Sequence, residues 1–440
     1  MREDDLIFQN PWWAKKESIL SDEKVSSAMG RAHKLLYDFE EGNFLIVGSR
    51  QVGKTTYLKL LVKKLLDEVN PRNVMYFACD LLKDHRDIVE VVRVFDSLAG
   101  EGEKHVFLDE VTFVDGWERA VKFLLDSPLL KDKHLYVTGS SSIGLKKERF
   151  PGRPIKVKEF MPLSFRGFCG LFGSGELKRA LGKSELHRLR PRDAFKLGRE
   201  LMVFVDEVAR LFNLYIQSGG YPKAFFELME EGGIKEETYG ACFDAAVFDV
   251  TKLGRSEKTA ASILQGVLRR YGSKFSLNSL AKEMEIESHL TVRDYLQIME
   301  GLYILRNYHQ IELTKKAVLY RKERKVYFTD PFLCQTFSRV LNFKLEQAQL
   351  VEGIVGEHLA RSFGNVYFHG GKREVDFVVG DAGVELKWQG RTSSSDFPRI
   401  GLQEKILLSR RDLDYVEERN LAILPAPIFL LGLPGGESKV

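Results

Sequence analysis

Short apolar runs alternate with helical patterns over the first third of the chain. The pattern predicts a helix at Lys54–Asp67 and strands at Phe44–Gly48, Val74–Cys79, His105–Asp109, His134–Gly139 and Ile155–Lys158. Continuous apolar strands separated by helices are typical of a parallel sheet that is covered on both faces. Ligands of such sheets bind at the carboxyl ends of the strands, so functional residues are expected there.

The pattern changes after this region. Residues 165–258 are mostly helical, and two further helices are predicted at residues 276–284 and 290–301. These helices precede β-prone runs at Tyr303–His309 and Lys325–Phe328. The last part of the chain opens with a helix near Val351 and continues as strands at Asn365–His369, Glu374–Val379 and Gly383–Trp388.

Length and composition narrow the class of protein. The 440 residues predict two to four domains. Hydrophobic residues make up 44% and charged residues 29% of the chain, which excludes a disordered or collagen-like protein. The net charge of +4, from 66 basic and 62 acidic residues, is too even to indicate nucleic-acid binding by itself. Four scattered cysteines without a CxxC pair favour a reduced, cytoplasmic protein.

No membrane segment is expected. The acidic N-terminus lacks the layout of a signal peptide. The most apolar late stretch, Leu421–Leu433, is broken by Pro425 and Pro427 and is shorter than the ~20 residues of a spanning helix.

A phosphate-binding loop is predicted between the first strand and the first helix. The pattern G-x-x-x-x-G-K-[ST] is matched by Gly48, Ser49, Arg50, Gln51, Val52, Gly53, Lys54 and Thr55, and Thr56 follows. Glycines let backbone N–H groups turn toward phosphates, Lys54 is expected to reach the β- and γ-phosphates, and the Thr55 hydroxyl is expected to ligate Mg²⁺. The alternative is a glycine turn that happens to precede a helix. The strand on one side and the helix on the other favour an ATP and Mg²⁺ site.

The strand that ends at Asp109 and Glu110 supplies a second set of candidates. Asp109 is predicted to hold Mg²⁺, directly or through water, and Glu110 to orient or deprotonate the attacking water. The alternative is a strand that ends in a solvated acidic pair.

Sensor and arginine candidates follow the next strand. Thr138 or Ser140 is a candidate sensor of the γ-phosphate, and a hydroxyl-rich loop or N-cap is the alternative. Arg149 or Arg153 is a candidate arginine finger, in cis or across a subunit interface. A solvated loop arginine is the alternative for both.

These motifs together resemble archaeal P-loop ATPases of the AAA-like class. The resemblance is carried by residues 48–55, Leu108–Glu110, Trp117, Thr138–Ser140, Gly152-Arg153, residues 160–165, Gly219–Pro222 and the tail around Glu374–Lys387. It implies an α/β fold with a P-loop NTPase parallel sheet over residues 1–168 and a helical lid or connector over 169–259. It also implies a winged-helix domain over 260–340 and a smaller C-terminal α/β nuclease-like domain over 345–440. Residues 10–13 are similar to the N-terminal segment of the family, either near the nucleotide base or as an apolar anchor.

The winged-helix candidate has residues suited to DNA. The outer face of its second helix would present His289, Arg293 and Gln297. A basic wing is expected from Lys315, Lys316, Arg321, Lys322, Arg324 and Lys325. The alternative is a helical packing module with solvated lysines, since acidic residues between the two helices dilute the positive field.

A carboxylate–lysine pattern lies on the C-terminal strands. Asp376 on one strand, with Glu385 and Lys387 on the same face of the next, forms a D…E-x-K arrangement. Such a trio binds Mg²⁺ and positions the water that attacks a phosphodiester. It resembles the restriction-endonuclease-like nucleases, which implies a further helix glutamate, either Glu352 or Glu357. The alternatives are a coincidence of strand-edge charges and a nuclease fold that does not cut.

The sequence therefore predicts a Mg²⁺-dependent ATPase, with Lys54, Glu110 and Arg153 as catalytic residues, that couples hydrolysis to DNA engagement or processing. The alternatives are a nucleotide-gated switch whose tail domains bind proteins and do not cut DNA, and a metal nuclease that the ATPase controls. ATP, ADP and DNA are the expected partners, and a homo-oligomer is compatible with an arginine finger from a neighbour.

Overall fold

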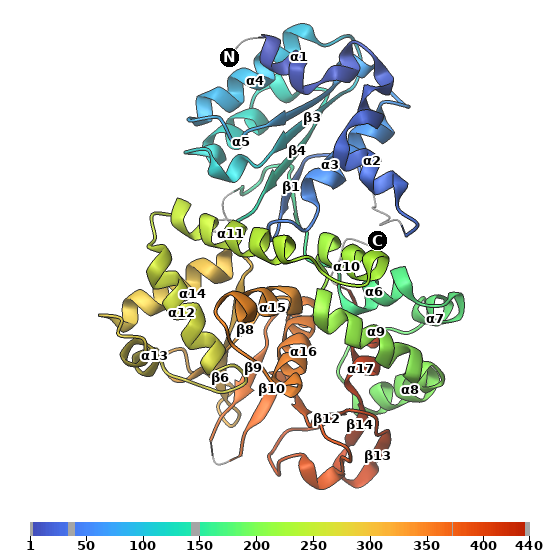
Figure 1. Ribbon diagram of the computed structural model, residues 1–440, viewed down its shortest axis with the longest axis vertical. Coiled ribbons are helices and arrows are strands. Elements are labelled where there is room, and N and C mark those ends of the chain that lie inside the picture. Colours follow the sequence, from blue (N-terminus) through green and yellow to red (C-terminus); the bar gives the residue numbers. More distant parts are fainter. Residues whose placement is uncertain (1–2, 34–39, 142–149, 372, 436–440) are drawn as a thin grey trace. The chain divides into compact units, whose positions relative to one another are not determined.

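The computed structural model describes residues 3–33, 40–141, 150–371 and 373–435 (Figure 1). They form two compact units, of which the first extends to Met161 and the second begins at Pro162.

The first unit is built on a five-stranded parallel sheet, which confirms the α/β class. The strands are β1 (Phe44–Val47), β2 (Val74–Ala78), β3 (Lys104–Asp109), β4 (Lys133–Gly139) and β5 (Lys156–Glu159). Their order is β2-β3-β4-β1-β5, and all neighbouring strands are parallel. Each strand begins and ends within one residue of its predicted bounds. For β1 to β4 the reason is that continuous apolar runs mark strands that are buried on both faces, whereas the edge strand β5 is largely exposed.

Helices cover both faces of this sheet. The α-helices are α1 (Glu3–Gln9), α2 (Glu23–Gly30), α3 (Lys54–Leu65), α4 (His85–Leu98) and α5 (Trp117–Asp126), and short 3-10 turns include η1 (Pro11–Trp13) and η2 (Lys16–Ser21). Helices α2 and α3 lie on one face, and α4 and α5 lie on the other (Figure 1). The core on the α3 side includes Ile46, Leu58, Phe107 and Tyr136.

The N-terminal segment is anchored along strand β2. The buried Asn10 side chain accepts from the N–H of Tyr76 at 2.7 Å and donates to its carbonyl oxygen at 2.9 Å. The indole N–H groups of Trp12 and Trp13 both donate to the carbonyl oxygen of Val74 at 2.9 Å. This segment thus satisfies the backbone groups at the edge of the sheet, and a cavity of about 600 Å³ lies between it and Lys59 of α3.

The second unit contains a nine-stranded sheet. Its strands are β6 (Leu305–Glu312), β7 (Ala317–Val318), β8 (Arg324–Phe328), β9 (Tyr367–His369), β10 (Val375–Val379), β11 (Ala382–Leu386), β12 (Glu404–Ser409), β13 (Asp414–Val416) and β14 (Leu421–Pro425). The order is β13-β14-β12-β11-β10-β9-β6-β7, and β8 also pairs with β6. Strand β6 is parallel to β9 and antiparallel to β8, so the strands expected as a wing and those expected in the nuclease-like domain share one sheet.

Helices of the second unit pack around this sheet. They are α6 (Phe165–Phe172), α7 (Gly175–Leu181), α8 (Pro191–Leu201), α9 (Val205–Ser218), α10 (Pro222–Glu231), α11 (Glu236–Lys252), α12 (Glu257–Arg269), α13 (Leu277–Glu283), α14 (His289–Gly301), α15 (Pro331–Val340), α16 (Gln347–Phe363) and α17 (Ala426–Gly432). Helix α8 packs against β14 and α17, and α9 packs against α15. Residues expected to form a lid therefore share a core with the C-terminal elements.

In the described part of the chain, no helix is both long and apolar enough to cross a bilayer. The apolar stretch Leu421–Leu433 forms the buried strand β14 and the short helix α17.

Candidate functional site

The predicted phosphate loop connects the end of β1 to the start of α3, at the carboxyl edge of the first sheet. Gly53 directly precedes α3 and has φ of 99°, and Gln51 has φ of 61°. A Cβ atom at Gly48 would lie 1.9 Å from the carbonyl oxygen of Phe160. The loop therefore needs glycine at Gly48 for close backbone approach and at Gly53 for its conformation, and it leads into a helix N-terminus that favours anions.

Lys54 is held inside this loop. Its side chain is buried, and the ammonium donates to the carbonyl oxygens of Gly48 at 2.9 Å and Ser49 at 2.7 Å. Thr55 and Thr56 follow in the first turn of α3 and are half-buried. The arrangement holds a positive charge beside the N–H groups of the loop, which suits a polyphosphate.

Asp109 is fixed by two hydroxyl groups. Its Oδ2 accepts from the hydroxyl of Tyr76 at 2.7 Å, and its Oδ1 accepts a short hydrogen bond from the hydroxyl of Thr138. Burial and the charge of Asp109 raise the pKa of Tyr76, so the phenol remains a donor. The Thr138 hydroxyl also accepts from the backbone N–H of Glu110 at 3.0 Å. One network therefore joins the middle of β2 to the carboxyl ends of β3 and β4.

Glu110 is strained and incompletely paired. Its φ is 57°, a left-handed conformation that is uncommon for residues other than glycine. Its Oε2 is buried and has no hydrogen-bond partner in the described chain, and the same holds for the hydroxyl oxygen of Ser140 beyond β4. Unpaired buried polar atoms and backbone strain cost free energy and are concentrated at functional sites. Both atoms fit a site that takes up a nucleotide and a water molecule.

Arg153 lies at the opposite edge of the sheet. It precedes β5, which is parallel to β1, so it is at the amino ends of the strands, whereas the loop is at the carboxyl ends. Its guanidinium forms two hydrogen bonds with Asp126, of 2.9 and 2.6 Å. The prediction that Arg153 acts in cis on the phosphate loop of the same chain is therefore wrong, because the two lie at opposite ends of the strands. A role across a subunit interface stays a prediction. Arg149 lies outside the described residues.

Sequence reasoning did not identify Tyr76 as part of the site. The residue sits in the middle of an apolar strand, where a tyrosine is ordinary, and its contact with Asp109 depends on the register of β2 against β3.

Two segments of the chain match family models. Residues 40–169 match a model described as "AAA domain", and residues 209–344 match a "Domain of unknown function (DUF8612)". All five strands of the first sheet lie inside the first match, so the part of the chain that resembles an AAA domain is the unit that carries the phosphate loop.

Relatives of similar length are uncharacterized. The uncharacterized protein MJ1544 of Methanocaldococcus jannaschii is 23% identical over 404 residues, which cover 87% of this chain and 80% of that protein. An uncharacterized protein of Haemophilus influenzae is 25% identical over 313 residues, which cover 67% of this chain and 68% of that protein.

Two solved structures are similar in part. The Thermotoga maritima RuvB Holliday junction branch migration motor has a TM-score of 0.28 and 15% identity, covering 76% of this chain and 95% of that chain. The Aeropyrum pernix ORC1 protein in complex with DNA has a TM-score of 0.32 and 13% identity, covering 74% and 92%. Scores below 0.5 do not show a shared arrangement of the whole chain, so these likenesses carry nothing about function.

A second cluster of charged residues lies in the second unit. Glu352 on α16, Asp376 on β10, and Glu385 with Lys387 at the end of β11 come together as the sequence predicts. The Asp376 N–H donates to Glu385 at 3.1 Å, and the Lys387 ammonium donates to Glu385 at 2.6 Å. Glu357, the alternative to Glu352, is instead buried between Arg306 and Arg361, which lower its pKa despite burial.

Lys325 on β8 is a member of this cluster that the sequence prediction placed elsewhere. Its ammonium lies 2.9 Å from Glu352, 2.9 Å from Asp376 and 3.0 Å from Glu374, and its side chain is only 1% exposed. Arg324 beside it is also buried. The prediction of a basic wing is therefore wrong for these two residues, while Lys315, Lys316, Arg321 and Lys322 are exposed.

Burial shapes the charges of the cluster. Burial and the neighbouring Asp376 raise the pKa of Glu352 to about 8 and that of Glu385 to about 7. Burial disfavours the charge of Lys325, but the surrounding carboxylates raise its pKa above the ordinary value. Near pH 7 the cluster thus carries fewer negative charges than it has carboxyl groups.

The DNA-binding candidates lie on the outer face of α14. His289, Arg293 and Gln297 are exposed, and Val292, Leu296 and Met299 are buried on the other side of the helix. Arg293 pairs with the adjacent Asp294 at 3.1 Å. The predicted face therefore exists, with its cationic group partly balanced by an acidic neighbour.

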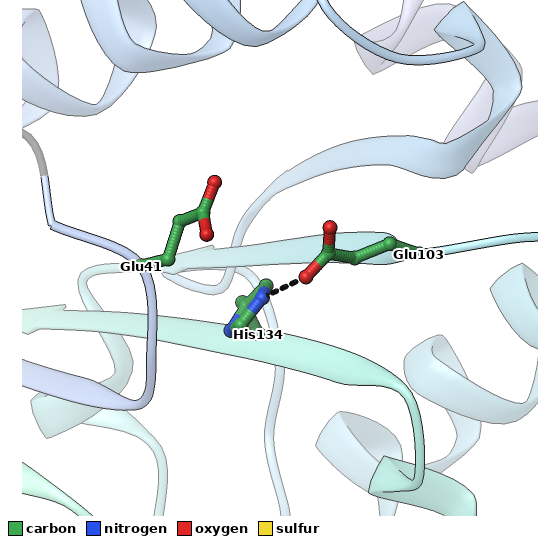
Figure 2. A group of neighbouring side chains, drawn as sticks. All are labelled: Glu41, Glu103 and His134. Carbon is green, nitrogen blue, oxygen red and sulfur yellow. Dashed lines mark hydrogen bonds and ion pairs between the residues drawn. The ribbon is translucent and has the colours of Figure 1, made fainter.

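A third group, Glu41, Glu103 and His134, lies at the amino-terminal edge of the first sheet. Figure 2 shows the His134 imidazole directed at Glu103, with Glu41 beside them. One ligand atom of each lies within 4.8 Å of the others, and both carboxylates are exposed. The group lies at the edge opposite the phosphate loop and takes no part in that site.

Proposed function

We propose that this protein is a Mg²⁺-dependent ATPase that couples hydrolysis to the engagement of DNA by its second unit. The network of Tyr76, Asp109, Thr138 and Glu110 behind a complete phosphate loop carries the proposal. In this proposal Lys54 and the N–H groups of residues 48–56 hold the phosphates. Mg²⁺ would neutralise their charge, held by Thr55 directly and by Asp109 through water, because both Asp109 oxygens already accept from hydroxyl groups.

Glu110 is the proposed base. Its strained backbone and unpaired Oε2 leave an acceptor at the edge of the site, where it would orient the attacking water and take its proton. Thr138 holds the backbone of Glu110 and the carboxylate of Asp109 at the same time, so it positions both groups. Ser140 is a second candidate for contact with the γ-phosphate.

The DNA part of the proposal rests on the exposed face of α14 with His289, Arg293 and Gln297, and on the exposed lysines of the β6–β8 hairpin. A helix that presents these side chains suits a groove, and the lysines suit phosphates. The competing proposal, a nucleotide-gated switch that binds proteins, is favoured by the pairing of Arg293 with Asp294.

The test is ATP hydrolysis by the wild type and Glu110→Gln, with and without branched and linear DNA. Faster turnover with DNA, abolished by the substitution, is expected. Equal turnover without DNA, together with no DNA binding at low salt, would favour the protein-binding switch.

A further inference from the structure

The acidic residues around the D…E-x-K motif of the second unit surround the side-chain ammonium of Lys325. A lysine ammonium has three N–H donors, and Lys325 has three carboxylates at 2.9–3.0 Å, from Glu352, Glu374 and Asp376. These carboxylates come from a helix and from the start of a strand, whereas Lys325 comes from β8. Lys325 is thus fully coordinated in the place where a shared divalent ion is expected from the sequence.

Backbone and side-chain donors occupy the remaining oxygens of the two strand carboxylates. Asp376 accepts from the N–H of Leu386 at 3.0 Å on the oxygen that Lys325 does not contact. Glu385 accepts from the Asp376 N–H at 3.1 Å on one oxygen and from Lys387 at 2.6 Å on the other. Divalent metal sites instead leave carboxylate oxygens directed at one point.

The spacing of the carboxylate oxygens in this cluster also argues against a divalent metal ion. Among the described residues, the group whose ligand atoms all lie within 4.8 Å of one another is Glu41, Glu103 and His134, and the cluster of the second unit is not in such an arrangement. The residues present therefore do not fit a Mg²⁺ ion as they stand.

We infer that Lys325 is a built-in substitute for the divalent ion, so that the nuclease-like cluster of the wild-type protein is closed to metal and holds the β8, β10 and α16 elements together. The second unit then engages its partner without hydrolysing a phosphodiester. Metal binding at this cluster is measured without nucleotide or DNA. The result therefore tests this inference independently of the proposed ATPase function.

The experiment is Mn²⁺ binding to the full chain without nucleotide, followed by electron paramagnetic resonance. The key variant is Lys325→Met, which removes the charge and keeps an unbranched side chain of similar length. Lys315→Met, an exposed lysine of the same hairpin, is the matched control. Glu103→Gln reports any ion held by the exposed group in the first unit.

Wild type and Asp376→Asn are expected to bind equal amounts of Mn²⁺, because the cluster holds none. Lys325→Met is expected to gain about one ion per chain and to lose it again when Asp376→Asn is added. Mn²⁺ is also expected to raise the melting temperature of Lys325→Met. The shift that Mn²⁺ causes in Lys315→Met is expected to equal the shift in wild type.

Two results would overturn the inference: wild-type Mn²⁺ binding that Asp376→Asn removes, or a folded Lys325→Met that gains no ion. If circular dichroism shows that Lys325→Met does not fold, the comparison of wild type with Asp376→Asn decides by itself. Glu385→Gln replaces Asp376→Asn if that variant is unfolded.

Discussion

Two hydroxyl groups determine how the acidic residues of the first unit are held. Tyr76 and Thr138 each donate to Asp109, and Thr138 also accepts from the backbone of Glu110. The orientation of the Asp109 carboxylate and the position of the Glu110 backbone are therefore both fixed, while the Glu110 carboxylate keeps an unpaired oxygen. Substitutions that remove the hydroxyl group of Tyr76 or Thr138 should lower the rate of ATP turnover more than the affinity for nucleotide, because the phosphate loop is a separate segment of the chain.

Glu110→Gln keeps the shape of the side chain and removes its basicity. Nucleotide affinity is expected to stay within a few-fold of wild type, and kcat is expected to fall by ~10²–10⁴-fold, the usual contribution of a general base. Steady-state hydrolysis and nucleotide binding measure the two quantities. Lys54→Ala is the contrasting variant, because it should weaken binding itself.

Thr138→Val replaces the hydroxyl by a methyl group of the same size. Asp109 and the Glu110 N–H would each lose a buried partner, at ~1–3 kcal/mol for each unsatisfied group. We expect kcat to fall by at least ~10-fold, measured by the same hydrolysis assay. Thr138→Ser keeps the hydroxyl and should recover most of the activity. Equal loss in both variants would show that the methyl group, and not the hydrogen bonds, matters.

Single residues also show where sequence reasoning reached its limit. Lys54, Thr55, Asp109 and Glu110 were located by fixed spacing from a glycine loop or a strand end, because local geometry dictates their positions. The contact between Lys325 and Asp376 joins residues 51 positions apart and depends on strand pairing that no local pattern encodes. A lysine at the start of a β-prone run is most often exposed, so nothing in the local sequence indicated that Lys325 is buried.

At the scale of elements, helix α16 is coupled to the start of α6 by one histidine. His358 is buried, its Nε2 accepts from the Phe165 N–H at 2.9 Å, and its Nδ1 lies 2.8 Å from the carbonyl oxygen of Ile354. This pairing uses the neutral ring, with one nitrogen as acceptor and the other as donor. Burial, and then the charge of Arg361, lower the pKa of His358 to about 4.

The lowered pKa predicts a loss of stability in acid. Above pH ~6.5 the ring is neutral in both folded and unfolded chains, so its full contribution is present. As the pH falls from ~6.5 to about 4, the unfolded chain takes up the proton first, and up to ~3 kcal/mol is lost. Urea unfolding at pH 7 and pH 5 should show a smaller pH effect in His358→Gln than in wild type. His187→Gln, an exposed histidine of the same unit, should resemble wild type.

Gly48 couples the phosphate loop to the residue after β5. An alanine Cβ at position 48 would lie 1.9 Å from the carbonyl oxygen of Phe160. The N–H of Phe160 also donates to the carbonyl oxygen of Val47 at 2.6 Å, which holds the two segments close together. We expect Gly48→Ala to lower the melting temperature by several degrees and to abolish nucleotide binding, since the backbone must shift. Gly30→Ala, which meets no atom within 4 Å, is the control. An unchanged melting temperature in Gly48→Ala would contradict the close approach.

Strands and helices with a clear apolar period were predictable, and those defined by long-range packing were not. Strands β1 to β4 and helices α13 and α14 lie close to their predicted bounds. Strands β12 and β14 were not predicted, because their buried parallel pairing gives apolar runs that resemble other buried segments. The parallel pairing of β6 with β9 could not be predicted from the sequence either, because it joins strands that are far apart along the chain.

At the scale of the whole molecule, the proposed DNA engagement predicts a salt-dependent affinity that depends on α14. Arg293→Gln is expected to weaken binding of duplex DNA by ~3–10-fold and to reduce the slope of log affinity against log salt by about one, because one cation is removed. Fluorescence anisotropy at several salt concentrations measures both. Lys258→Gln, an exposed lysine on α12, should change binding less. Equal effects of both variants would remove α14 as the contact surface.

The shared sheet of the second unit limits how the protein can be divided. A chain that ended after Val340 would keep β6 and β8 but lose β9, leaving backbone groups near His309 and Gln310 without their strand partner. An open strand edge is a template for pairing with other chains. Such a shortened protein should therefore self-associate, and residues 260–340 are not a portable module that can be grafted or studied on its own.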